Sequence, residues 1–303
     1  MVIEGLTLDG TQSSFNNGAH GLRVDACGGQ VWIQDCQILG GADAVSDRHA
    51  VYVTDSDQVP LVRCAATGTS SPVTAIPHLA AGLRAIDSRV FAWESEFNGG
   101  IGGDGAHLDG GTLFAEGSVL RGGEGYGVGN PSGVGCQLAI NGGNGVEIGT
   151  GGIGTVVDTH LLGGAADPDG CSSNGFPAWV FFAGLTQLPG PSVAFAVESP
   201  LADGATSTLT FEGQPGDLPV VLMATAVAPV TYLPKFTGAI ATGSPVLFFL
   251  APLPGSGSVS VPFGFGDALP PGTGSTIFLQ GAVLKAAGGA LLADPAALTT
   301  YDG

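Results

Sequence analysis

Polar and aromatic side chains recur at one outward position of a unit that repeats along the first half of the chain. The members of this series are Arg23, Tyr52, Arg84, His107 and Glu147. A second outward series, two residues further along each unit, consists of Asp25, Thr54 and Asp109. A stripe of such residues suits a bound glycan, because rings can stack on sugars and charged groups can hydrogen-bond to sugar hydroxyls. We expect a glycan-binding face formed by Arg23, Tyr52, Arg84, His107 and Asp109, unless these are ordinary solvated residues of a sheet.

Residue types that bind metals give weaker patterns. Asp167 and Asp169 lie in the turn Asp167-Pro168-Asp169-Gly170 and offer oxygen ligands for a loosely held calcium ion. The turn lacks the length and the terminal Glu of a dedicated calcium loop. His20 and His49 fall at the same corner of successive units, but no carboxylate accompanies them in the pattern. Calcium is therefore the one possible cofactor that the sequence suggests.

The five cysteines support structural roles. Cys36 and Cys64 occupy the same inward position of successive units, and we expect a stacked pair of small buried thiols. Cys136 and Cys171 flank the last unit and a domain junction, where a disulfide is plausible. Cys27 is left over, and its spacing from Cys36 fits no zinc pattern.

The unit that positions these residues occurs six times. A short strand of the Gly-Leu-Arg-Val type is followed by a second strand that ends in Gly-Gly or a close substitute. In chain order the six units are Gly21–Cys27 with Val31–Gly41, Ala50–Ser56 with Val59–Gly68, Gly82–Ser88 with Arg89–Gly100, Gly105–Gly111 with Thr112–Gly123, Gly125–Asn130 with Val134–Gly143, and Gly145–Thr150 with Thr155–Gly164. A period of about 20–30 residues indicates a solenoid, in which each unit buries its apolar side against its neighbours.

Apolar residues alternate within each unit, as a strand with one buried face requires. In the first strand of a unit, Leu22 and Val24 are expected to point inward. In the second strand, the inward positions fall to residues such as Val31 and Ile33. The Gly-Gly pairs would supply the corners, where positive φ can be needed. The pattern predicts a parallel β-helix.

The stretch Gly21 to Gly40, with Val-x-Ile-x-Asp-Cys-x-Ile-x-Gly as its second half, resembles the right-handed parallel β-helix repeat of pectin-lyase-like proteins. The resemblance covers roughly residues 3–165. It implies the fold, and it leaves the activity open because the repeat encodes core packing.

Many relatives of that kind cut or eliminate acidic polysaccharides, so an enzyme is one alternative. The hydrolases among them need clustered carboxylates, a nearby His and a basic pair that holds the sugar acid. The sequence contains no Asn-Thr-Asp, Asp-Asp, Gly-His-Gly or Arg-Ile-Lys element. No catalytic residue is predicted, and the sequence leaves open whether the protein is an enzyme while favouring a non-enzymatic role.

Composition agrees with a secreted, loop-rich, all-β protein. The chain has 303 residues with 53 Gly and 20 Pro, yet 44% of its residues are hydrophobic, which argues against disorder. Its net charge of −18 includes only two lysines, so nucleic acid is an improbable partner. No apolar run reaches the ~18–20 residues that cross a bilayer. No signal peptide is visible, and Met1 begins inside an apparent coil, so we expect either a fragment of a longer exported protein or a mis-started reading frame.

The pattern changes near residue 165. Residues 167–175 are rich in turn formers, and separate strands follow at the spacing typical of an antiparallel sandwich. We expect a β-helix of about six to seven coils over residues 1–166, a linker over 167–175 and a β-sandwich over 176–303. The last part weakly resembles C-terminal sandwich modules of secreted bacterial surface proteins. The expected strands are Ser192–Glu198, Ala205–Glu212, Val220–Thr225, Val246–Ala251, Ser256–Phe265, Thr276–Leu284 and Ala290–Ala293.

A third outward series, on the second strand of the units, is aromatic and comprises Trp32, Phe91, Trp93 and Phe114. Soluble monomers seldom leave such a patch open. The sandwich, a neighbouring subunit or a sugar would have to cover it, and we interpret it as a candidate assembly interface. The predicted function is that of an extracellular or cell-surface structural or adhesive protein that forms oligomers or filaments, or joins a matrix. A carbohydrate-active enzyme or glycan-binding protein is the alternative.

Overall fold

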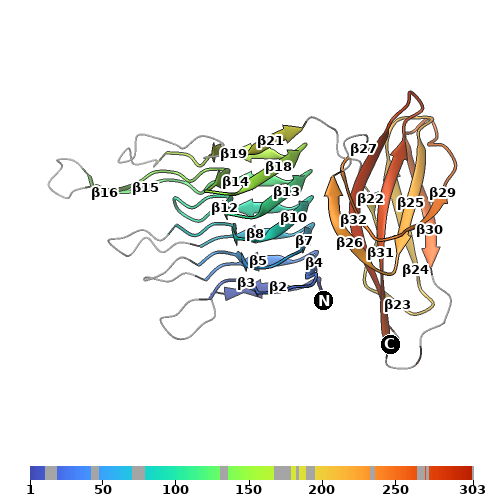
Figure 1. Ribbon diagram of the computed structural model, residues 1–303, viewed down its shortest axis with the longest axis horizontal. Coiled ribbons are helices and arrows are strands. Elements are labelled where there is room, and N and C mark those ends of the chain that lie inside the picture. Colours follow the sequence, from blue (N-terminus) through green and yellow to red (C-terminus); the bar gives the residue numbers. More distant parts are fainter. Residues whose placement is uncertain are drawn as a thin grey trace. The chain divides into compact units, whose positions relative to one another are not determined.

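The computed structural model describes residues 1–10, 19–41, 48–69, 79–129, 136–166, 179–181, 184–188, 195–232, 236–264, 270 and 273–301, and these contain no α-helix. The chain divides into two compact units, Met1–Leu188 and Pro189–Gly303. The first unit is a parallel β-helix and the second an antiparallel β-sandwich, so the predicted fold class is confirmed (Figure 1).

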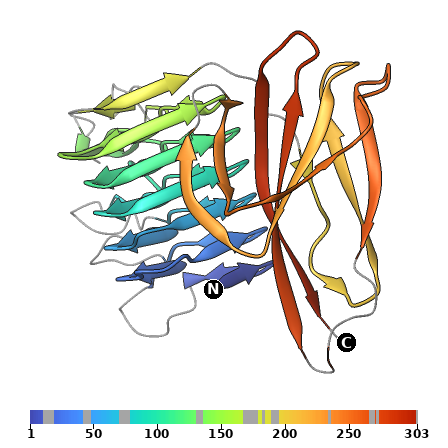
Figure 2. The same cartoon turned by 45° about the vertical axis from the view of Figure 1, so that its right-hand side comes forward.

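In the β-helix the chain passes through three parallel sheets in turn, and the coils stack one above another (Figures 1 and 2). Sheet A contains β1 (Val2–Glu4), β4 (Trp32–Gln34), β7 (Val59–Val62), β10 (Arg89–Trp93), β13 (Thr112–Glu116), β18 (Ile153–Val157) and β21 (Leu185–Leu188). Sheet B contains β2 (Thr7–Asp9), β5 (Gln37–Leu39), β8 (Ala65–Thr67), β11 (Glu96–Asn98), β14 (Val119–Arg121) and β19 (His160–Leu162). Sheet C contains β3 (Leu22–Asp25), β6 (Val51–Thr54), β9 (Leu83–Ile86), β12 (Ala106–Asp109), β17 (Val146–Ile148) and β20 (Trp179–Phe181).

The interior of the coil is one apolar core built from the inward residues of all three sheets. One row across sheet A shows how it forms, because Ile33, Leu61 and Ala92 lie in direct register and are fully buried. Cys36 and Cys64, at the next corner, also belong to this core, and both are buried free thiols. The predicted inward and outward alternation is confirmed.

The corner between sheets A and B is made by a residue with positive φ followed by a small polar or thiol side chain. Asp35, Arg63 and Glu94 have φ of 46° to 52°, and each precedes a Cys or Ser. The hydroxyl oxygen of Ser95 accepts a hydrogen bond from the backbone N–H of Cys64, one coil away, at 3.0 Å. These side chains satisfy backbone groups that the turn leaves without a strand partner.

The Gly-Gly pairs serve a different purpose from the one expected. Gly123 and Gly143 do not have positive φ, and they lie where the backbones of successive coils approach most closely. The N–H of Gly143 donates to the carbonyl oxygen of Gly123 at 2.8 Å, and a Cβ on Gly123 would overlap the carbonyl oxygen of Gly100. Close approach, rather than φ, therefore selects glycine at this corner.

Two predicted boundaries differ from the structure. The fifth predicted unit is not a coil, because β15 (Tyr126–Gly129) and β16 (Cys136–Ile140) pair antiparallel as a hairpin. The β-helix also continues past residue 166, since β20 and β21 add to sheets C and A. The boundary between the two units in the sequence therefore falls between Leu188 and Pro189. All of the predicted linker 167–175 lies outside the described residues.

The sandwich buries its own core between a small and a large sheet. The small sheet has the order β22 (Phe195–Ala196), β24 (Thr206–Glu212) and β30 (Ser258–Gly264). The large sheet has the order β23 (Leu201–Ala202), β32 (Ala290–Tyr301), β31 (Gly274–Leu284), β25 (Leu218–Ala224) and β29 (Val246–Phe249), with β27 (Phe236–Thr237) also on β32. A further pair joins β26 (Val227–Tyr232) and β28 (Ala239–Thr242). Phe211 of the small sheet and Leu279 of the large sheet are fully buried in the shared core.

Candidate functional site on sheet C

The outward face of sheet C carries the polar series found in the sequence. The strand register aligns Arg23, Tyr52, Arg84, His107 and Glu147 on successive coils. Parallel in-register pairing brings each of these side chains next to its counterpart about 4.8 Å away. In the next outward series, Ile86 interrupts the run between Thr54 and Asp109.

A further row precedes the strands of sheet C, three residues before the first series. Backbone hydrogen bonds between successive coils set its register, as in the pairs Gly82 with Asp104 and Gly105 with Asn144. The row contains His20, His49, Ala81, Asp104 and Asn144. It lies at the corner between sheets B and C, so its side chains flank the outward face.

At the N-terminal end of the face, three rings are stacked. The centroids of His20 and Tyr52 are 4.5 Å apart with nearly parallel planes, and those of His20 and His49 are 5.5 Å apart. The Arg23 guanidinium lies 5.8 Å from the centroid of the Tyr52 ring and is paired with Asp25 at 2.8 Å. The arrangement gives a stack of three aromatic rings beside a neutralised cation.

His49 is the buried member of this stack. Its Nδ1 accepts a hydrogen bond from the backbone N–H of Ala81 at 3.0 Å. Burial, with the charges of His20, Arg84 and His107 as further causes, lowers the pKa of His49 to about 3. The imidazole is therefore neutral at physiological pH.

A cluster of carboxylates surrounds His107 at the other end of the face. His107 Nδ1 lies 3.0 Å from Asp104 Oδ2, and Nε2 lies 3.6 Å from Asp109 Oδ1 and 3.9 Å from Glu147 Oε1. Arg84 is paired with Asp109. One imidazole thus contacts three carboxylates, and among the described residues one of these, Asp109, is paired with a guanidinium.

Asn144 holds two of these carboxylates together. Its Nδ2 donates to Asp104 Oδ1 and to Glu147 Oε2, both at 3.0 Å, and its backbone N–H donates to Asp104 Oδ1 at 2.8 Å. Burial and the negative charge of Asp104 raise the pKa of the Glu147 carboxyl. Asp104, His107 and Glu147 each offer one ligand atom, and these atoms lie within 4.8 Å of one another.

A pocket of about 410 Å³ joins the two ends of the face. It is lined by His49, Tyr52, Leu79, Ala81, Arg84, Ile86, Asp104, His107 and Glu147. The pocket combines a ring surface, hydrogen-bonding carboxylates and an imidazole. Such a set can bind a hydroxyl-rich ligand, hold a cation or exchange protons with a ligand.

Sequence reasoning missed Asp104 and Asn144 and gave Glu147 no role. Asp104 and Asn144 stand three residues before His107 and Glu147, the same offset that separates His49 from Tyr52. Aligning the residues that precede each strand would have extended the noted His20–His49 pair to Asp104. Three of the predicted glycan-binding residues, Tyr52, Arg84 and His107, line the pocket. Arg23 and Asp109 adjoin it through Tyr52 and His107.

The aromatic series lies on the outward face of sheet A and outside the interior core. Trp32, Phe91, Trp93 and Phe114 are nevertheless 1%, 7%, 0% and 6% exposed. The Trp93 ring contacts those of both Phe91 and Phe114, with centroid distances of 6.1 and 5.9 Å. The role of this series in assembly stays a prediction.

Other predicted sites fall outside the described part of the chain. They are the predicted calcium ligands Asp167 and Asp169 and the predicted disulfide partner Cys171. The other partner, Cys136, lies in β16, but its side chain is not among those described.

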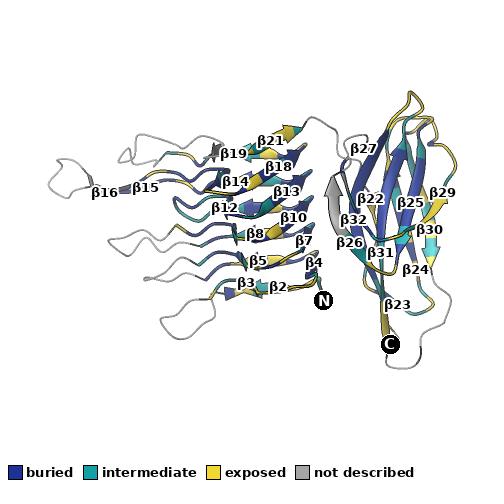
Figure 3. Ribbon diagram, in the orientation of Figure 1, coloured by how far each residue is buried: buried dark blue, intermediate teal, exposed yellow. Residues whose placement is uncertain are grey.

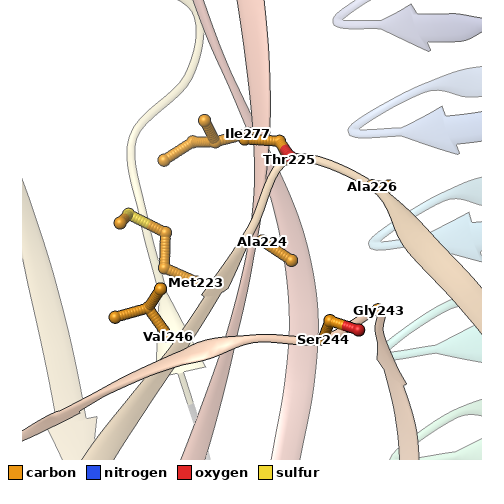
Figure 4. A pocket seen from close by; sticks show the side chains of 8 residues that line it. All are labelled: Met223, Ala224, Thr225, Ala226, Gly243, Ser244, Val246 and Ile277. Atoms are coloured by element: carbon orange, nitrogen blue, oxygen red, sulfur yellow. The ribbon is translucent and has the colours of Figure 1, made fainter.

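The sandwich contains a second hollow, of about 530 Å³, lined by Met223, Ala224, Thr225, Ala226, Gly243, Ser244, Val246 and Ile277 (Figure 4). Its lining carries no titratable group. Of the side chains drawn there, those of Met223, Val246 and Ile277 are the large apolar ones. We therefore assign this hollow no catalytic or metal-binding role.

Comparison with protein-family models and with curated proteins gives no match for this chain. Among the described residues, no helix has the length and apolarity to span a membrane.

Proposed function

We propose that the protein is an extracellular structural or adhesive protein that binds glycans through the outward face of sheet C. The observation that carries this proposal is the pocket of about 410 Å³, in which Tyr52 and the Asp104–His107–Glu147 group meet. A flat ring beside fixed hydrogen-bonding groups is what a sugar ring requires, because one face of a sugar is apolar and its edge carries hydroxyls. The acidic, lysine-poor composition supports an extracellular location.

A neutral glycan fits this face better than an acidic one. Arg23 is paired with Asp25 and Arg84 with Asp109, so neither guanidinium is left to bind a sugar carboxylate alone. The net charge of −18 also repels polyanions at long range. Carboxylates in the pocket accept hydrogen bonds from sugar hydroxyls.

The test is binding of the full chain to soluble neutral and acidic polysaccharides, measured by titration calorimetry. Tyr52→Ala removes the ring surface, and we expect roughly a tenfold loss of affinity, because each 1.4 kcal/mol corresponds to that factor. Tyr301→Ala, which removes an exposed tyrosine from the sandwich, is the matched control and should bind as wild type does. Absence of any glycan binding, or equal losses in both variants, would contradict the proposal.

The same samples separate binding from catalysis. Release of reducing ends or of unsaturated sugar that disappears in His107→Ala would assign this face to an enzyme instead. Binding without release supports the adhesive function.

A specific observation also favours self-association. Strand β29 is an edge strand among the described strands of the large sheet, and all four of its residues are exposed, at 42–61% (Figure 3). They are Val246, Leu247, Phe248 and Phe249. An exposed apolar edge is a template for pairing with another strand, so we propose a second copy of the chain as its partner.

A further inference from the structure

We propose that Asp104, His107 and Glu147 form a binding site for a divalent metal ion of the Zn²⁺ or Mn²⁺ class. The proposal does not depend on glycan binding, because it concerns the affinity of the chain for the ion alone. One imidazole nitrogen and two carboxylate oxygens form a mixed ligand set, which zinc and manganese accept and which an all-oxygen calcium site does not resemble.

The distances fit an ion with small adjustments. Two ligand atoms bound to one ion at about 2.1 Å lie roughly 3–4 Å apart. His107 Nδ1 and Asp104 Oδ2 are already 3.0 Å apart, and the ligand atoms of all three residues lie within 4.8 Å of one another. All three residues are partly buried, which limits their rotamer freedom.

The charges around the site also favour a cation. Asp104, Asp109 and Glu147 converge on His107, and Arg84 pairs with Asp109. Two carboxylates are therefore held near each other by a single neutral amide group. A bound cation would offset the repulsion between these two negative charges.

Asn144 gives an independent indication. This residue is 7% exposed, and its Oδ1 is buried without a hydrogen-bond partner among the described residues. The amide nitrogen occupies the position between the two carboxylates. The nitrogen and oxygen of an amide exchange places by a half-turn of χ2. With an ion present, the same half-turn would point the amide oxygen, rather than the amide N–H group, toward the cation.

The site would keep open coordination positions. Three protein ligands and an adjoining pocket of about 410 Å³ leave room for water or for a ligand oxygen. Closed structural sites use four protein ligands, whereas sites that bind small molecules keep a free position. The ion would therefore face the pocket.

The experiment uses the full chain after treatment with a chelator. Titration calorimetry with Mn²⁺ and with Zn²⁺ should give one equivalent per chain, and Co²⁺ should give a visible spectrum altered by a nitrogen ligand. Glu147→Gln and His107→Gln should each weaken binding at least tenfold, since each removes one ligand. Glu96→Gln is the matched control, because Glu96 is exposed on sheet B, and it should leave binding unchanged.

Three outcomes would overturn the proposal. The first is no saturable binding of Mn²⁺, Zn²⁺ or Co²⁺ by chain that circular dichroism shows to be folded. The second is binding that both ligand variants retain in full. The third is binding of Ca²⁺ alone that does not change in His107→Gln. Glycan titrations in the presence of chelator are a separate measurement, so failure of the metal site and failure of the glycan proposal are distinguishable.

Discussion

His49 is a buried histidine whose protonation opposes folding. It is 6% exposed, its Nδ1 accepts the N–H of Ala81, and burial is the main cause that lowers its pKa to about 3. The unfolded chain, with an ordinary histidine pKa of about 6.5, binds a proton in the window between these values while the folded chain does not. His49 therefore contributes stability that is present above about pH 6.5 and is lost as pH falls toward 3.

We expect the free energy of unfolding to decrease by up to about 1.4 kcal/mol per pH unit through this group between pH 6 and 4. His49→Asn keeps an acceptor near Ala81 without a titrating ring, so its decrease over the same window should be smaller. Urea denaturation at several pH values measures both slopes. His160→Asn, at an exposed histidine of sheet B, is the control and should retain the wild-type slope. Identical slopes for His49→Asn and wild type would contradict the expectation.

At the level of the elements, the strands were predictable and the corners were not. The alternation in Leu22–Asp25 states directly which side chains face the core, because a strand has a period of two. The positive φ of Asp35 and Arg63 could not be predicted from the sequence pattern, since the surrounding coil imposes it on residue types that rarely adopt it. The sequence pattern predicts a coil where β15 and β16 form a hairpin, because alternation does not distinguish parallel from antiparallel partners.

The candidate site was partly predictable for the same reason. Arg84 and His107 lie within strands, where the repeat fixes their register. Asp104 and Asn144 lie before strands, at the end of connections whose length varies from coil to coil. Strand β12 begins 23 residues after β9, whereas β17 begins 40 residues after β12. Asp104 and Asn144 are therefore found by counting back three residues from His107 and Glu147, whereas counting along the connections does not align them.

The glycine corner gives a prediction at this scale. A Cβ at position 123 would overlap the carbonyl oxygen of Gly100, a backbone atom that cannot move aside cheaply. Gly123→Ala should cost about 1–3 kcal/mol or more, because overpacking at a close contact forces the backbone to shift. Gly29→Ala is the matched control, since an added Cβ there meets no atom within 4 Å. Thermal unfolding followed by circular dichroism compares the two, and equal melting temperatures would show that the coils can separate at this corner.

At the scale of the whole molecule, two compact units each have a core of their own. The sequence predicts an assembly interface at the aromatic series of sheet A, and these rings are 0–7% exposed. The exposed strand β29 is the better candidate for self-association. Two copies of one edge strand can pair antiparallel about a twofold axis, and such an isologous contact closes after two copies. A dimer rather than a filament is the assembly that this edge favours.

We expect the full chain to dimerise at micromolar concentration, and more strongly at high salt, because salt screens the repulsion between chains of net charge −18. Phe249→Lys places a charge on the edge, which is a device that natural sheets use against pairing, and it should make the protein monomeric. Ile153→Lys introduces the same charge at a residue 54% exposed on the β-helix and should leave the dimer intact. Sedimentation velocity measures all three proteins. A monomeric wild type would exclude association through β29, and loss of the dimer in both variants would attribute it to general surface charge.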